Sequence, residues 1–143
     1  MVTLVDGLAG GLVATIAMTA SMLALGDDSP PPTALFLAEY AGDGDPEAYA
    51  MPGMLLHLGY GVAAGAVFAL VVPALGFVSV AGPTGGVLWG LAYGVLLFVG
   101  AAAFWMNVVL GLDPEPKEIG AFLLFHLIYG LVLGGWVGVG VLG

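Results

Sequence analysis

The chain has 143 residues, of which 61% are hydrophobic and 8% are charged, and its mean hydropathy is +1.12. A soluble domain is roughly half apolar and about a quarter charged, so this composition excludes that class and indicates a polytopic membrane protein. The chain has ten acidic residues and a single base, Lys117. This excludes nucleic acid as a partner, because phosphate contacts need Lys and Arg.

The acidic balance and the lack of cysteine narrow the chemistry further. The formal net charge of −9 argues against docking on an anionic membrane surface, and acidic loops that are nearly free of Lys favour a salt-loving archaeal host, where salt screens self-repulsion. Without cysteine there are no disulfides, no thiolate metal sites and no covalently attached c-type haem.

Four apolar segments are each long enough to span a bilayer core, which takes about 20 helical residues. They run from about Val2 to Leu25, Pro52 to Leu75, Gly85 to Leu110 and Glu118 to Leu142. The first begins without positive charge, and its apolar run is longer than that of a signal peptide, so we expect a retained helix. The prediction is an all-α, polytopic membrane four-helix bundle that forms a single membrane domain over residues 1–143.

The connection between the first two segments is a long acidic loop over residues 26–51. Within it, residues 34–40 are expected to form a short helix that lies in the membrane interface, with Thr33 as its cap. The acidic run over residues 43–47 is interpreted as a solvated turn, because it lacks the spacing of an EF-hand loop.

An internal repeat relates the two halves of the chain. Residues 57–65 read HLGYGVAAG and residues 126–134 read HLIYGLVLG, while GLAGG at 7–11 matches GLAYG at 90–94. The common order of these matches predicts two parallel two-helix repeats, about 1–75 and about 85–143, related by an axis along the membrane normal. The two histidines of the chain, His57 and His126, would then lie at similar depth and meet across the bundle axis.

Further residues extend the pattern to most of the chain. A Gly-rich first helix and a Pro-rich loop precede a helix with His-x-x-Tyr, and a second Gly-rich helix and Leu-Gly-Leu-Asp-Pro precede a helix with His-Leu-x-Tyr. This order resembles the YagU-type family of small prokaryotic membrane proteins. The resemblance is carried by Gly7, Gly11, His57, Gly90, Gly94, Gly111, Pro114, Glu118, His126 and Gly130. It implies a four-helix membrane fold with both termini in the cytoplasm, and it brings no defined activity.

The two histidines stand at the end of small-residue stripes. Residues at i, i+3, i+4, i+7 and i+8 share one face of a helix, so His57 shares a face with Tyr60, Gly61 and Gly65. By the same spacing, His126 shares a face with Tyr129, Gly130 and Gly134. An ionisable side chain inside a membrane is costly and usually has a task.

The first interpretation of these stripes is a small b-type haem protein for electron transfer or a haem-binding subunit. His57 and His126 would be the axial metal ligands, since bundles supply such ligands from facing helices. The four stripe glycines would line the haem b, with Tyr60 and Tyr129 behind the ligands. Another flat apolar ligand, such as a quinone or a carotenoid, would use the same groove, and Lys117 is the single base available to the haem propionates.

Two alternatives remain open. The glycine stripes are also small-xxx-small motifs that pack helices in lipid, which would make the protein a non-catalytic scaffold, a homo-oligomer or an accessory subunit of a larger complex. The histidines could also serve a proton, ion or small-solute pathway, although such pathways usually add buried carboxylates. No nucleophile with a base and an orienting acid is present, so no catalytic residue is predicted.

Overall fold

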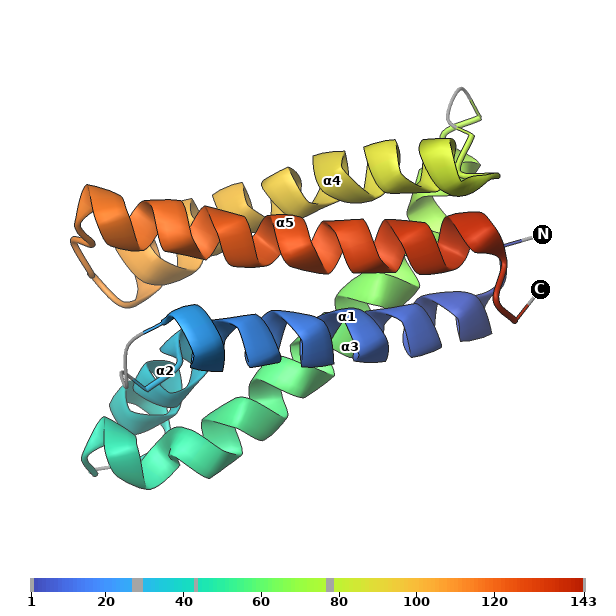
Figure 1. Ribbon diagram of the computed structural model, residues 1–143. Helices are drawn as coiled ribbons and strands as arrows, with labels where there is room; N and C mark the ends of the chain where they lie inside the picture. The colour runs from blue at the N-terminus through green and yellow to red at the C-terminus, as the bar shows by residue number, and fades with distance from the viewer. Residues whose placement is uncertain (1, 27–29, 43, 77–78, 143) are drawn as a thin grey trace.

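The computed structural model describes residues 2–26, 30–42, 44–76 and 79–142, and its long helices lie side by side (Figure 1). The elements are α1 (Leu4–Leu25), α2 (Pro32–Tyr40), the 3-10 turn η1 (Pro46–Tyr49), α3 (Ala50–Ala74), α4 (Pro83–Val99), the π-helix η2 (Gly100–Val109) and α5 (Pro116–Val139). Within the described residues, four stretches are long and apolar enough to cross a membrane: Leu4–Leu25, Pro46–Ala74, Pro83–Val109 and Pro116–Val139. The predicted all-α class with four long apolar helices is confirmed, and the spans are those of a multi-pass membrane protein in contact with lipid.

Local signals in the sequence set the helix ends. The Thr3 side chain accepts a hydrogen bond from the Asp6 amide at 3.1 Å, and the Thr3 amide donates to the Asp6 carboxylate at 2.9 Å, which closes a capping box on α1. Pro83 and Pro116 occupy the first positions of α4 and α5, where a missing amide hydrogen costs nothing. Gly140 ends α5 in the left-handed conformation, with φ 68°.

The third predicted helix changes its hydrogen bonding halfway. It is α-helical to Val99 and continues as η2 to Val109, with i→i+5 bonds such as Leu110 N–H to the Trp105 carbonyl at 3.0 Å. The apolar pattern runs through this point without a break, so the sequence predicts one uniform helix. π-helical segments are rare and are often found at functional sites. The side chains of η2 are therefore candidates for a functional site.

The short helix expected in the acidic loop is present as α2, but its start differs from the prediction. Thr33 is not the cap, because the helix begins at Pro32 after Pro31. The Thr33 hydroxyl instead donates to the Gly53 carbonyl at 2.6 Å and so ties α2 to the start of α3. Of the loop 26–51, residues 27–29 and 43 lie outside the described residues, and with them part of the predicted acidic turn.

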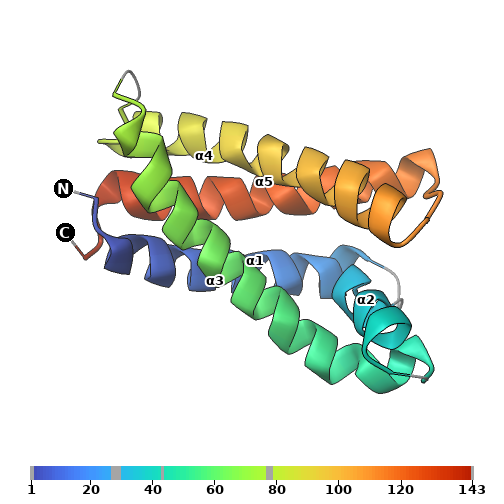
Figure 2. The ribbon, with the colours of Figure 1, turned by 180° about the vertical axis from the view of Figure 1, so that it is seen from behind.

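The four long helices form two pairs. α1 packs against α3, α4 packs against α5, and α1 and α5 form the seam between the pairs (Figures 1 and 2). α1 and α4 run in one direction and α3 and α5 in the other, with α3 steeply inclined across α1 (Figure 2). The start of α1 and the end of α5 lie at the same end of the bundle.

Glycine stripes form the contacts within each pair. A Cβ built on Gly90 of α4 would lie 2.7 Å from the Cα of Gly134 in α5, and one built on Gly11 of α1 would lie 3.1 Å from the Cα of Gly65 in α3. The stripes of α3 and α5 therefore do not face each other. Each stripe packs against the other helix of its own pair, because that helix carries small residues at the same spacing.

Side chains rather than glycines connect α3 to the second pair. The Tyr129 hydroxyl of α5 donates to the Gly61 carbonyl at 2.6 Å, and the Tyr93 hydroxyl of α4 donates to the Ala64 carbonyl at 2.9 Å. Phe68 and Leu133 are fully buried in the core between the pairs. These larger groups hold α3 away from α5 and leave space between them.

Candidate functional site

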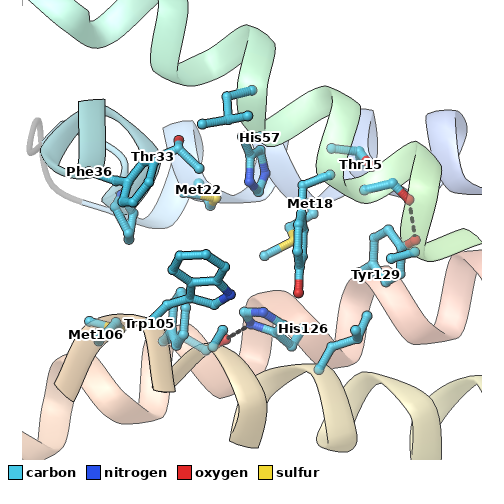
Figure 3. Close-up of a pocket in the computed structure, with 18 of the residues that line it drawn as sticks. Thr15, Met18, Met22, Thr33, Phe36, His57, Trp105, Met106, His126 and Tyr129 are labelled. Carbon is cyan, nitrogen blue, oxygen red and sulfur yellow. Dashed lines mark hydrogen bonds between the residues drawn. The ribbon is translucent and has the colours of Figure 1, made fainter. Parts of the chain in front are cut away.

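A cavity of about 210 Å³ lies between the two helix pairs, in the half of the bundle that α2 covers. α1, α3, η2 and α5 form most of its walls, α2 adds Pro32, Thr33 and Phe36, α4 adds Leu97, and nearly all of the lining is apolar. His57 and His126 both line it, and Figure 3 shows their rings reaching in from α3 and α5 on opposite sides. The two histidines of the sequence motif therefore reach one space from different helix pairs.

His126 is the better held of the two imidazoles. It is 6% exposed, and its Nδ1 lies 2.8 Å from the carbonyl oxygen of Phe122, one turn earlier in α5. A carbonyl only accepts, so Nδ1 carries the hydrogen, and a neutral ring then has a lone pair at Nε2. The ring also stacks edge-on against Phe122, with centroids 4.5 Å apart. Proteins orient metal-binding histidines by the same kind of hydrogen bond, made by the ring nitrogen that does not bind the metal.

His57 has an unpaired nitrogen. Its side chain is partly buried, and its Nε2 atom is buried without a hydrogen-bond partner among the described residues. Buried polar atoms are nearly always paired with protein, water or an ion, so an unpaired atom requires an explanation. A ligand in the cavity would supply that partner.

The other residues of the predicted site divide between the cavity and the helix interfaces. Tyr60, Gly61 and Tyr129 line the cavity with the histidines. Gly65 packs against α1, and Gly130 and Gly134 pack against α4, so these three do not line it. The Tyr129 hydroxyl is occupied by its bond to Gly61, and the Tyr60 side chain is 44% exposed.

Sequence reasoning missed the methionines and Trp105. Met18 and Met22 of α1 and Met106 of η2 line the cavity, and Figure 3 shows Met18 between the two histidines and Met22 beside His57 in that view. The i, i+4 spacing of Met18 and Met22 puts them on one helix face. No motif in the sequence connects that face to the histidines, because the link depends on how the pairs assemble.

The predicted haem b fits this site in its donor atoms and not in its volume. Two imidazoles from facing helices are the right ligands for haem iron, and His126 is anchored as such a ligand would be. Pockets for drug-sized ligands occupy roughly 300–1,000 Å³, and a porphyrin is larger than many of those ligands, whereas this cavity has about 210 Å³. Lys117, the one base, is exposed at the start of α5. Haem b stays a prediction.

In comparisons with known proteins, no family model, no curated protein and no solved structure matches this chain. The resemblance to the YagU-type family therefore stays a prediction that rests on the glycine and histidine motifs alone.

Proposed function

We propose that this small multi-pass membrane protein binds a metal centre between His57 and His126. The observation that carries the proposal is the arrival of both imidazoles, from two helix pairs, at one apolar cavity. The carbonyl of Phe122 fixes the His126 ring, and the buried Nε2 of His57 lacks a partner. Neutral imidazole is the form that ligates metals, and burial in an apolar site favours it.

Two kinds of metal centre satisfy this description. Haem b would make the protein a bis-histidine electron-transfer or haem-binding subunit, and it requires α3 and α5 to part beyond the present 210 Å³. A bare metal ion with its ligands occupies less space than a macrocycle. The volume of the cavity therefore supports the ion over the haem.

The absorption spectrum and the metal content of detergent-purified protein test the proposal together. Protein from haem-replete, metal-supplemented cells is expected to carry either a Soret band or bound metal, and His57→Ala and His126→Ala are each expected to lose it. Met51→Leu is the control, because Met51 is 73% exposed and is not among the residues that line the cavity. Colourless, metal-free wild-type protein would refute the proposal.

A non-catalytic helix-packing role is the second candidate, and the glycine contacts favour it. The glycine stripes of α1 and α3 pack against each other, and so do those of α4 and α5. They therefore stabilise this bundle and are not available to a homo-oligomer. Colourless, metal-free protein that melts cooperatively would favour this role. A proton pathway has less support, because none of the described residues that line the cavity is a carboxylate.

We also propose that the chain is a tandem repeat, in a register different from the sequence match. Gly11 contacts the Gly61 carbonyl and the Gly65 Cα, just as Gly90 contacts the equivalent atoms of Gly130 and Gly134. This packing makes Gly11 the counterpart of Gly90, whereas the sequence match of 7–11 with 90–94 pairs Gly7 with Gly90. The two registers differ by one helical turn.

A further inference from the structure

We infer that the metal bound between the two histidines is Cu(I), and that the thioethers of Met18 and Met22 complete its ligand set. The inference rests on the proposed function and deepens it by naming the ion and two further ligands. The inference depends on the methionines that line the cavity, which are not part of the histidine motif.

Methionine is concentrated at this cavity. Among the residues that the structure describes, three methionines line it: Met18, Met22 and Met106. Met18 is 4% exposed, and Met22 lies one helical turn further along the same face of α1. Figure 3 shows the Met18 side chain between His57 and His126 and the Met22 side chain beside His57.

The softness of the donors selects the metal. Thioether sulfur is a soft ligand that favours Cu(I), while Mg²⁺, Ca²⁺ and Mn²⁺ prefer carboxylates, carbonyls and water. Zinc sites use three or four Cys, His or carboxylate ligands, and no group of three or more His, Asp or Glu is assembled in the described part of the chain. Two imidazoles with two thioethers therefore suit Cu(I) better than these ions.

The charge of the cavity lining also favours Cu(I). Imidazole and thioether are neutral, and none of the described lining residues is charged, so the ion would keep its full charge in an apolar space. The desolvation cost rises with the square of the charge, so a divalent ion would cost roughly four times as much as Cu(I). Trp105, which also lines the cavity, adds an aromatic face, and such faces attract cations.

Methionine also fills irregular gaps in hydrophobic cores, so the test has to separate ligation from packing. Exchange of Met for Leu nearly conserves volume and usually costs less than about 1.5 kcal/mol. The double variant M18L/M22L therefore removes both sulfurs while it keeps the packing. M51L is the matched control, because Met51 is 73% exposed at the start of α3.

The experiment is an anaerobic titration of detergent-purified protein with Cu(I), reduced by ascorbate and buffered by bathocuproine disulfonate as a coloured competitor. We expect one equivalent of Cu(I) per chain, no binding in His57→Ala or His126→Ala, and unchanged binding in M51L. M18L/M22L is expected to bind at least about tenfold more weakly, because even groups behind a ligand can change affinity by roughly 10- to 100-fold.

X-ray absorption of Cu(I)-loaded wild-type protein gives a second readout that needs no variant. The chain has no cysteine, so sulfur bound to copper in thiol-free buffer must come from methionine. Nitrogen without sulfur around the copper, or M18L/M22L binding as tightly as wild type, would overturn the thioether ligands.

The failures of the two proposals are distinguishable. If the histidines retain haem or another metal while Cu(I) does not bind, the copper inference fails and the proposed function stands. If neither haem nor any metal binds through the histidines, both fail.

Discussion

Tyr129 shows how a single hydrogen bond holds the cavity wall. Its hydroxyl is buried and donates to the Gly61 carbonyl at 2.6 Å, across the gap between α5 and α3. Interhelical bonds of this kind in membranes contribute roughly 0.6–2 kcal/mol. We expect Tyr129→Phe to lower the free energy of unfolding by that amount, as measured by SDS-induced unfolding in mixed micelles. Tyr60→Phe is the control, and an equal effect of the two substitutions would contradict this role.

Replacement of His57 is expected to have the opposite effect on stability, because its Nε2 atom is unpaired. A buried polar atom without a partner destabilises the metal-free protein, so His57→Leu is expected to melt at the same temperature as the wild type or higher in the presence of a chelator. His126→Leu is expected to melt lower, because it removes the bond to the Phe122 carbonyl. A clear loss of stability in His57→Leu would mean that His57 has a structural partner rather than a ligand-binding role.

At the scale of elements, the glycine contacts decide how the helices pair. A methyl group on Gly90 would lie 2.7 Å from the Cα of Gly134, so α4 and α5 would have to separate. Overpacking of this kind costs about 1–3 kcal/mol, and we expect Gly90→Ala to lower the melting temperature in detergent.

Gly59→Ala is the matched control for this prediction. Gly59 is also helical, and a Cβ built on it meets nothing within 4 Å. Replacing a helical glycine by alanine is otherwise favourable, so Gly59→Ala should be neutral or slightly stabilising. Equal destabilisation by Gly59→Ala and Gly90→Ala would show that the α4–α5 contact is not the cause.

The elements themselves could largely be predicted from the sequence, and the faces they use could not. Hydropathy and length locate the four spans, and the starts predicted at about Gly85 and Glu118 lie two residues after the observed starts at Pro83 and Pro116. The Thr33 hydroxyl at the start of α2 bonds to the Gly53 carbonyl, and the Tyr40 hydroxyl bonds to the Val109 carbonyl at the end of η2. Local patterns do not encode such contacts, because their partners are distant in sequence.

At the scale of the whole molecule, the arrangement of the helix ends predicts a topology. The start of α1, the α3–α4 connection and the end of α5 lie at one end of the bundle, and the start of α3 and the η2–α5 connection lie at the other (Figure 1). The chain has no cysteine, so single cysteines can be introduced at the exposed Ser79, Leu142, Glu47 and Asp113. On intact cells, a membrane-impermeant maleimide should react either with the cysteines at 47 and 113 or with those at 79 and 142. It should not react with both pairs.

Labelling that groups these positions in any other way would contradict the fold. The predicted cytoplasmic placement of both termini requires that Leu142→Cys becomes reactive only after the cells are opened.

The site was partly visible in the sequence. The repeated His-Leu-x-Tyr-Gly motif identifies His57 and His126 as a pair, and both line one cavity. Gly65, Gly130 and Gly134 pack against other helices instead, and Met18 and Met22 come from α1. A motif can name residues within its own helix, while the remaining walls of a cavity follow from tertiary packing.

The stoichiometry of metal or haem in the two single histidine variants tests the central claim most directly. If His57 and His126 share one ligand, each alanine variant should lose nearly all of it, and the double variant should lose no more. If each histidine binds independently, every single variant should keep about half of the wild-type amount and the double variant none. The first result is the one predicted here, and the second would contradict a shared site.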